Sequence, residues 1–344
     1  MNKKVLLIRL SSLGDVIHTI PLANALKSAG YELTWLVSEK GIQVLEGNPC
    51  VDKVILAPLQ KWKKRGFSFE SFKEYLSILK EIRKEKYDIA IDAQMMFKSL
   101  YWMAFCGAKR RIISRQAREL SILGANEIIP RITTDHEHPV IRNYMKFADY
   151  LDVNTEEIKV TLPERSQEVK NKVDELLKDI KSPLVIMAPA TTWKAKHWNK
   201  DHWKKVVNEL KEECSIVFTG GPKDNDLIEY ISEGKFLNLA GKTDVLELAE
   251  VFSRADVVIA PDSGSTHLAW ATQKPFVLTI FTCTPLKYLA PPTENCKAVT
   301  GNIECQPCFK RKCKFKTDAC TNLPLPEEII NIVKNALSNN YNVV

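Results

Sequence analysis

Three polar loops in this sequence contain the residue types that group-transfer chemistry requires, and each follows a short apolar run. Residues 11–15 end in Asp15, a carboxylate that can take a proton from a hydroxyl. Residues 190–198 combine threonines with lysines, which suit a phosphate. Residues 262–267 begin a helix-like segment, where free backbone amides attract an anion without a metal. The loops thus offer a base, a cation and an anion site.

Each loop also has a purely structural interpretation. Asp15 at a helix start can cap free backbone amides. Lysines in loops are usually exposed to solvent without a specific task. Asp262 or Ser263 can be a helix cap, and His267 can be a partly buried histidine with satisfied hydrogen bonds. Position in the sequence leaves both interpretations open.

Metal-binding patterns are weak. Residues 135–138 have the sequence DHEH, but a proline follows and the surroundings are typical of a loop. Cys305, Cys308, Cys313 and Cys320 are interleaved with five lysines and arginines and resemble a zinc knuckle, although the second pair is not a C-x-x-C. A reduced, basic surface loop is the alternative. We expect no metal and no cofactor, and we find neither a G-x-G-x-x-G nor a P-loop motif.

The elements that must position these loops are strand-like runs alternating with helix-length segments. Strands are expected at 5–10, 33–37, 53–56, 88–92, 184–187, 215–218, 256–260 and 276–281. Helices are expected at 71–86, 163–180, 198–212, 245–253 and 326–337. This alternation predicts an α/β fold with parallel sheets, in which ligands bind beyond the carboxyl ends of the strands.

Length and composition fit two domains. The chain has 344 residues, of which 45% are hydrophobic and 26% charged. We place the boundary between residues 1–160 and 161–344. No apolar run approaches the ~18 residues of a membrane span, and no signal peptide is evident. The nine cysteines are an odd number and argue for a reducing cytoplasm.

Positive charge is concentrated in one block. The formal net charge is +7, and residues 59–120 contain 15 Lys/Arg against 7 Asp/Glu. This block can be a solvated surface, or it can bind an anionic membrane, an anionic lipid or nucleic acid. Residues 100–105 are apolar with basic flanks at Lys98 and 109–111, so they could rest on a membrane. A buried helix with charged ends is the alternative, and we favour it.

The three loops together resemble a known family. Residues 11–21, SSLGDVIHTIP, resemble the opening signature of bacterial glycosyltransferase family nine, the lipopolysaccharide heptosyltransferases. Residues 190–192 with 196–198, and 262–264 with His267, follow in the order and spacing of that family. The resemblance covers nearly the whole chain. On the acceptor side it is closest to heptosyltransferase I, at residues 61–64, 92–94, 97–99 and 117–119, whereas the cysteine-rich tail resembles heptosyltransferase II.

The resemblance implies a GT-B architecture, with two Rossmann-like domains facing a cleft. The acceptor would bind residues 1–160 and the nucleotide sugar residues 161–344, with the C-terminal helix packing back on the first domain. It further implies inverting, metal-independent transfer of heptose from ADP-heptose to the Kdo residue of Kdo-lipid A, in lipopolysaccharide inner-core synthesis. Heptosyltransferase II, or another member that adds a sugar to inner-core heptose, is the alternative.

Roles for individual residues follow from the loops and the resemblance. We expect Asp15 to be the base and Lys196 to neutralise the departing diphosphate. The expected donor-binding residues are Thr191, Thr192, Lys196, Thr243, Asp262, Ser263, Gly264, Ser265 and His267. The expected acceptor-binding residues are Ser12, Gly14, Lys61, Lys63, Lys64, Lys98 and Arg118.

These assignments predict a cytoplasmic enzyme, peripheral on the inner face of the inner membrane, that does not bind nucleic acid. The rival hypothesis is a non-catalytic basic protein that binds nucleic acid or anionic lipid through residues 59–120. Aromatic residues are present in that block, but no nucleic-acid-binding motif is recognisable.

Overall fold

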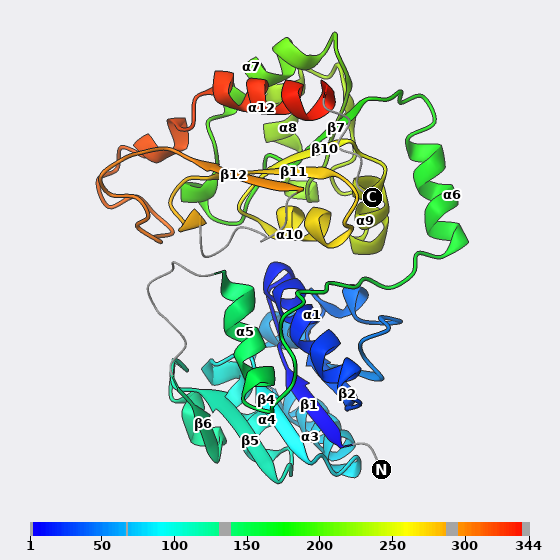
Figure 1. Ribbon diagram of the computed structural model, residues 1–344, viewed down its shortest axis with the longest axis vertical. Helices are drawn as coiled ribbons and strands as arrows, with labels where there is room; N and C mark the ends of the chain where they lie inside the picture. The colour runs from blue at the N-terminus through cyan, green and yellow to red at the C-terminus, as the bar shows by residue number, and fades with distance from the viewer. Residues whose placement is uncertain (1–2, 67, 131–138, 287–294, 339–344) are drawn as a thin grey trace. The chain divides into compact units, whose positions relative to one another are not determined.

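Two parallel sheets organise the chain, each in its own unit. The computed structural model describes residues 3–66, 68–130, 139–286 and 295–338. The chain divides into Met1–Glu164 and Arg165–Val344, and each unit contains one six-stranded sheet (Figure 1). The α/β class expected from the alternating pattern is confirmed.

The first unit alternates strands with helices. Its strands are β1 Lys4–Ile8, β2 Glu32–Val37, β3 Lys53–Leu56, β4 Ile89–Asp92, β5 Arg110–Ser114 and β6 Glu127–Ile129. Its helices are α1 Leu13–Ser28, α2 Leu59–Arg65, α3 Phe69–Lys84, α4 Phe97–Phe105 and α5 Val140–Asp149, with short 3-10 turns η1 Ile42–Val44 and η2 Ser121–Gly124. Helix α1 packs against α5, whereas α3 and α4 contribute Ile82, Trp102 and Met103 to a core that includes Leu6 and Ile8 of β1.

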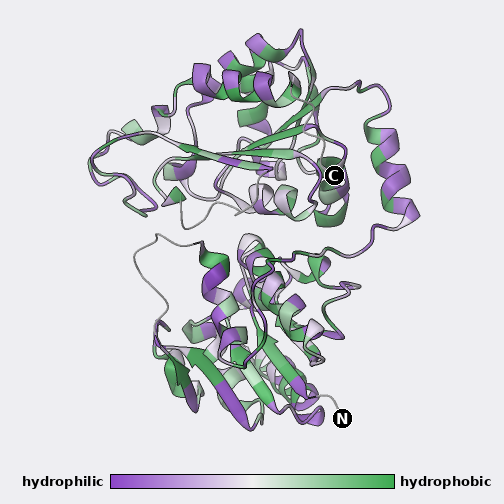
Figure 2. Cartoon of the chain, in the orientation of Figure 1, coloured by the Kyte–Doolittle hydropathy of each residue, from purple (hydrophilic) through white to green (hydrophobic). Residues whose placement is uncertain are grey.

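The second unit repeats this arrangement. Its strands are β7 Leu184–Met187, β8 Ser215–Phe218, β9 Leu237–Asn238, β10 Val257–Pro261, β11 Phe276–Phe281 and β12 Cys296–Thr300. Its helices are α6 Gln167–Leu176, α7 Lys200–Leu210, α8 Asn225–Ser232, α9 Val245–Ser253, α10 Gly264–Ala271 and α12 Pro326–Ser338, with 3-10 turns η3 Lys194–Lys196, η4 Pro222–Asp224 and η5 Ala319–Asn322. Most of these strands are hydrophobic in Figure 2, whereas β12 has a hydrophilic part and α6 is largely hydrophilic.

The C-terminal helix belongs to the core of the second unit. In the structure α12 packs against α7, and its buried residues Ile329, Ile330 and Val333 join the same cluster as Trp203 of α7. That this helix also packs on the first domain stays a prediction.

Both sheets have the same strand order. The first is β3-β2-β1-β4-β5-β6 and the second, reversed, is β9-β8-β7-β10-β11-β12, with every described pair parallel. In this order the direction of the connections reverses between β1 and β4, and between β7 and β10. Such a switch point leaves a crevice outside the carboxyl ends of the strands, which is where open α/β sheets bind ligands.

Differences from the expected elements occur at sheet edges and in charged segments. Residues 110–111 were expected as a basic flank, but they lie in β5, and Arg110 forms two hydrogen bonds with Glu127 of β6. Strand β9 has only two residues, too few for a hydrophobic period. Neighbouring strands, rather than local sequence, place such segments in a sheet.

The segment that leaves the first unit is fixed to it by two asparagines. The amide of Asn48 donates to the carbonyls of Val44 and Thr161, each at 2.9 Å, and its oxygen accepts from the Thr161 hydroxyl at 2.9 Å. Asn24 donates to the carbonyl of Lys159 at 3.0 Å. These bonds explain why the first unit extends to Glu164, past the boundary expected at residue 160.

Asn48→Ala should lower the stability of the first unit by about 1–3 kcal/mol, because it leaves buried carbonyls without a donor. Asn48 is only 2% exposed, so water cannot easily replace the amide. Urea unfolding followed by circular dichroism measures the change. Asn171→Ala, on the exposed surface of α6, is the control and should change little. Equal midpoints for the two variants would show that Asn48 does not hold this segment.

Candidate active site

The crevice of the first unit lies between the loop after β1 and the turn after β4. The side-chain oxygen of Gln94 accepts from the backbone amides of Leu10 and Ser11, each at 3.0 Å. The ammonium of Lys98, in the first turn of α4, donates to the Ser11 hydroxyl at 2.5 Å. The turn after β4 therefore holds the loop that leads to Asp15, and it brings Lys98, an expected acceptor residue, to that loop.

Asp15 is both a capping residue and an accessible carboxylate. It is the third residue of α1, and its Oδ2 accepts from the backbone amide and the hydroxyl of Ser12, both at 2.9 Å. Its Oδ1 accepts from Arg9 at 2.7 Å, and the side chain remains 40% exposed. Burial raises its pKa, but the charge of Arg9 and the Ser12 hydrogen bonds outweigh this effect, so the pKa lies below its ordinary value. Asp15 is therefore ionised at neutral pH.

Arg9 was missing from the expected site. It directly follows β1, is 4% exposed, and donates to the carbonyl of Ala93 as well as to Asp15. Its guanidinium also lies over the ring of Tyr144, 5.1 Å from the centroid. The sequence contains a signal for this residue, because an arginine directly after a buried strand is itself expected to be buried. A buried cation requires a carboxylate close by, so Arg9 could have been predicted to pair with Asp15.

A buried carboxyl group shapes the turn after β4. Asp92 accepts from the backbone amides of Gln94 and Met95, both at 2.9 Å, and from the hydroxyl of Ser99 at 2.7 Å. Burial raises the pKa of Asp92 to about 6, although these hydrogen bonds oppose the shift. The residue positions Gln94 and, through Ser99, the start of α4.

The remaining acceptor residues are more dispersed. Ser12 is the N-cap of α1 and Gly14 is buried in its first turn. Lys61 is paired with Glu74 of α3 at 2.8 Å, so its charge is already neutralised. Lys63 and Lys64 are exposed on α2, and Arg118 is exposed before η2. Among the described residues, Lys98 contacts the loop that contains Asp15, through Ser11. The other four expected cations form no hydrogen bond or ion pair with the described residues of that loop, so the structure does not bring them to it.

In the second unit, an ion pair joins two of the expected donor residues across its switch point. The ammonium of Lys196 lies 2.5 Å from Oδ2 of Asp262, with side-chain exposures of 16% and 4%. Thr284 donates to the same oxygen at 2.7 Å, and Nε2 of His267 lies 3.7 Å from Oδ1. Burial acts to raise the pKa of Asp262, but His267 and Lys196 hold it well below the ordinary range. Thr284, which follows β11, is a second residue that the sequence analysis missed.

The loop after β7 is folded on itself around Lys196. The hydroxyl of Thr191 donates to the carbonyl of Trp193 at 2.7 Å, and the ring of His197 contacts the backbone of Thr191. The ammonium of Lys196 lies 4.8 Å from the centroid of the Trp193 ring. Thr192 is exposed in this loop. Thr243 lies just before α9. Among the described residues, no contact links it to Lys196 or Asp262.

The start of α10 completes the crevice of the second unit. Ser263 is its N-cap, and its buried Oγ has no hydrogen-bond partner among the described residues. Gly264 and Ser265 form the first turn, and the Thr266 hydroxyl donates to the carbonyl of Pro261 at 2.8 Å. The first amides of a helix have no partner within it, so this end is suited to an anion.

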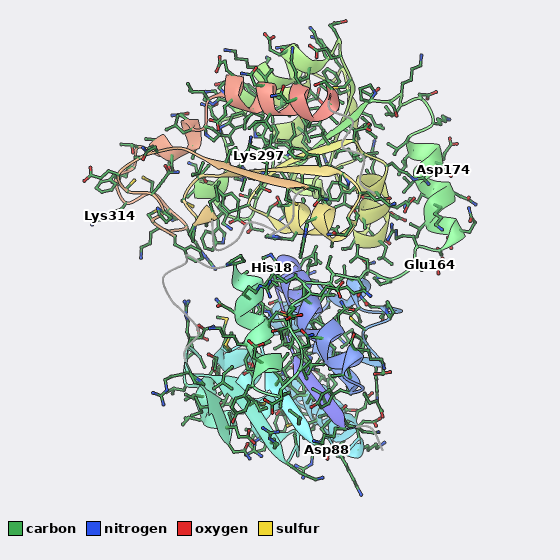
Figure 3. The ribbon with its side chains drawn as sticks, in the orientation of Figure 1. His18, Asp88, Glu164, Asp174, Lys297 and Lys314 are labelled. Atoms are coloured by element: carbon green, nitrogen blue, oxygen red, sulfur yellow. The ribbon has the colours of Figure 1, made fainter. Side chains whose placement is uncertain are left out.

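The four cysteines of the tail come together, with a fifth from the loop after β11. Cys283, Cys305, Cys308, Cys313 and Cys320 line one cavity of about 770 Å³. The described residues include no group of three His, Cys, Asp or Glu arranged to hold a metal ion. Residues 135–138, the other possible metal cluster of the sequence, lie outside the described residues. Lys314 marks the loop in Figure 3.

The cysteine-rich loop is attached to the donor residues. The amide of Phe309 donates to the carbonyl of Cys283 at 2.7 Å, and the hydroxyl of Thr282 donates to the carbonyl of Ala195 at 2.7 Å. Arg311 lies over the Trp193 ring, 5.3 Å from its centroid. The loop therefore supports the segment that contains Lys196 and brings a further cation near it.

Comparison with known proteins identifies the family. The model of glycosyltransferase family 9 (heptosyltransferase) matches residues 75–318. The chain belongs to this family. The resemblance noted from the three loops is thus confirmed, and the protein is a glycosyltransferase.

Individual relatives agree with this assignment. Lipopolysaccharide heptosyltransferase 1 of Pseudomonas aeruginosa is 26% identical to this glycosyltransferase over 336 residues, which cover 91% of this chain and 88% of that protein. The enzyme of the same name from Escherichia coli is 26% identical over 280 residues, covering 79% and 86%. Among solved structures, a family 9 glycosyltransferase of Veillonella parvula has a TM-score of 0.80 at 19% identity, covering 98% of each chain. E. coli heptosyltransferase WaaC with ADP has a TM-score of 0.75 at 21% identity, covering 97% and 99%. The GT-B fold expected for the glycosyltransferase is confirmed.

Replacing Arg9 by Gln in this glycosyltransferase should raise the pKa of Asp15, because the carboxylate loses its adjacent positive charge. Carbon-13 NMR titration of labelled aspartates measures the pKa directly. In the wild type the depressed pKa means that ionised Asp15 stabilises the first unit above the unfolded pKa, and this contribution is lost as pH falls through the folded pKa.

The same titration contains its own control. The resonance of Asp52, which is paired with Lys27, should not move in the Arg9→Gln variant. An unchanged pKa for Asp15 in this variant would show that Arg9 does not set its charge state.

Proposed function

We propose that this glycosyltransferase transfers heptose from ADP-heptose to the Kdo residue of Kdo-lipid A, as a heptosyltransferase I of lipopolysaccharide inner-core synthesis. The observation that carries the proposal is the 26% identity to lipopolysaccharide heptosyltransferase 1 over 91% of the chain. Two solved structures of the same fold are E. coli heptosyltransferase WaaC with ADP and with ADP-2-deoxy-2-fluoro heptose. We place the enzyme in the cytoplasm, peripheral on the inner membrane, with no role in nucleic-acid binding. No helix among the described residues is long and apolar enough to cross a membrane.

In the proposed reaction, the acceptor hydroxyl binds next to Asp15. Its oxygen attacks the anomeric carbon of heptose on the face opposite the diphosphate, forming the new glycosidic bond while the bond to the phosphate oxygen breaks. The configuration is inverted by this single displacement. The hydroxyl proton passes to Asp15 as the new bond forms, since the hydroxyl becomes acidic only then. Arg9 keeps Asp15 ionised and fixes its orientation.

The second unit stabilises the negative charge that develops on ADP. Lys196 is partly exposed while paired with Asp262, and it can contact a phosphate oxygen from that position. Asp262 holds the ammonium toward the crevice, as Thr284 and His267 hold Asp262. The first amides of α10 donate hydrogen bonds to the same charge. The Ser263 hydroxyl, which has no hydrogen-bond partner among the described residues, is a further donor. These groups allow departure of the diphosphate without a metal.

A second function is favoured by two observations. The cysteine-rich loop, which resembles that of heptosyltransferase II, contacts the donor loop through Arg311 and Trp193. A lipooligosaccharide heptosyltransferase 2 of Campylobacter jejuni is 29% identical over 174 residues, which cover 48% of this chain. The alternative acceptor is therefore an inner-core heptose rather than Kdo.

The full-length enzyme, incubated with ADP-heptose and Kdo-lipid A in excess EDTA, should form heptosyl-Kdo-lipid A. Mass spectrometry of the lipid measures one added heptose, and NMR of the product reports its anomeric configuration. Reaction only with an acceptor that already contains heptose would identify heptosyltransferase II instead. Failure of both acceptors with ADP-heptose, or dependence on an added metal, would contradict the proposed reaction.

Two variants should separate the proposed roles of the loops. Asp15→Asn should lower kcat by about 10²–10⁴-fold, the usual contribution of a positioned base, while the Kd for ADP stays within a few-fold. Lys196→Ala should weaken ADP binding by about tenfold or more, because a charge-assisted contact is lost. Isothermal titration calorimetry gives the Kd, and thermal unfolding checks that each variant folds. Full turnover of Asp15→Asn would exclude Asp15 as the base.

A further inference from the structure

Helix α4 buries one face and exposes another that is strongly apolar. Ser99, Trp102 and Met103 are buried in the first unit. Phe97, Tyr101 and Phe105 recur at intervals of four residues and are 47–49% exposed. This spacing places the three aromatic side chains in one stripe along the helix, which is about 13 Å long. Residues 100–105 are thus only partly buried: one face of this helical segment packs in the core, and the other face is exposed to solvent.

The apolar stripe continues onto the neighbouring turn. Helix α4 packs against η2, because Gly124 approaches the backbone of Leu100 and the side chain of Met103. In this segment Leu120 and Leu123 are 68% and 71% exposed. We call these five residues, Phe97, Tyr101, Phe105, Leu120 and Leu123, the α4 apolar face. Large exposed side chains grouped in this way indicate an interaction surface rather than ordinary exposure.

Arginines that contact the same elements border the α4 apolar face. Arg83 donates to the carbonyl of Phe105 at 3.5 Å, and Arg111 donates to the carbonyl of Gly124 at 2.9 Å. Arg118 bonds through its carbonyl to Ser121, the first residue of η2. Among the described residues none of the three forms an ion pair within 4 Å of a carboxylate. Glu119 is adjacent to Arg118 in the chain, and its side chain accepts a hydrogen bond from the amide of Phe97.

We infer that the α4 apolar face, with its arginine border, docks on the surface of an anionic lipid bilayer. Aromatic and leucine side chains would enter the interface, and the guanidinium groups would contact lipid phosphates. Charge complementarity favours this occupant over a second copy of the chain, because two copies would bring three unpaired arginines on each side together. The inference deepens the proposed function, on which it rests for the lipid nature of the acceptor.

The position of the face suits an acceptor held in a membrane. Phe97 begins α4, and its neighbour Lys98 donates to Ser11 in the loop of Asp15. One end of the apolar stripe therefore reaches the edge of the first unit's crevice. A glycolipid anchored in the bilayer could present its sugar to Asp15 without leaving the membrane.

Co-sedimentation with large vesicles tests the docking. The full-length protein should bind vesicles of phosphatidylglycerol and phosphatidylcholine (1:1) and bind pure phosphatidylcholine much more weakly. Phe105→Ser/Leu123→Ser should lower the partition coefficient on the mixed vesicles by about tenfold or more. Arg83→Gln/Arg118→Gln should lower it about fivefold for each charge removed. The control Phe315→Ser/Leu325→Ser removes side chains of similar exposure from the second unit and should bind like the wild type.

Transfer to an acyl-free, water-soluble Kdo acceptor separates this inference from the proposed function. The Phe105→Ser/Leu123→Ser variant should keep wild-type turnover on this acceptor, which also shows that it is folded, and lose turnover on acceptor embedded in vesicles. A wild type that transfers heptose but does not bind anionic vesicles would overturn the docking and leave the function standing. Vesicle binding without heptose transfer to either acceptor would support the docking and contradict the proposed function. Equal vesicle binding by both serine double variants, or a dimer in gel filtration that dissociates only in Phe105→Ser/Leu123→Ser, would also overturn the docking.

Discussion

The strand order of the two sheets is the constraint on which the rest of the structure depends. In each unit the connections run one way from the first strand and the other way from the fourth, and such a switch point leaves a crevice outside the carboxyl ends of these strands. Backbone groups and side chains of two loops meet there. Gln94 and Lys98 contact the loop after β1, and Asp262 contacts Lys196 in the loop after β7. The same topology thus produces two polar crevices from unrelated sequences.

The charges in these crevices are balanced before any ligand binds. Arg9 compensates Asp15 in one unit, and Asp262 compensates Lys196 in the other. A buried charge without a partner would cost several kcal/mol, so each functional group requires a supporting group of opposite sign. The supporting groups are in turn held by neutral donors and acceptors, such as the carbonyl of Ala93 and the hydroxyl of Thr284. The reactive groups are therefore fixed in position by the fold itself.

Sequence patterns were sufficient for the buried strands and the loops that follow them. Runs such as 184–187 and 276–281 are apolar and β-branched, and they form central strands whose residues are all buried. Short edge strands and strands that begin with charged residues were missed, because the edge strand β9 has two residues and the inner strand β5 begins with two arginines. Three supporting residues, Arg9, Gln94 and Thr284, each have a partner that follows a different strand. Only the assembled sheet brings these partners together. A periodic pattern contains no information about such contacts.

The Lys196–Asp262 pair has a consequence for how a dissolved nucleotide approaches the enzyme. Two opposite charges 2.5 Å apart form a dipole whose field decays quickly, so the pair attracts an anion only at short range. Attraction over longer distances must come from cations without such a partner, and Arg311, which lies over the same Trp193 ring as Lys196, is one such cation. Encounter and final placement are thus divided between two segments. Higher ionic strength would slow the encounter with the nucleotide, since salt screens distant charges. It would leave the final placement of the nucleotide nearly unaffected.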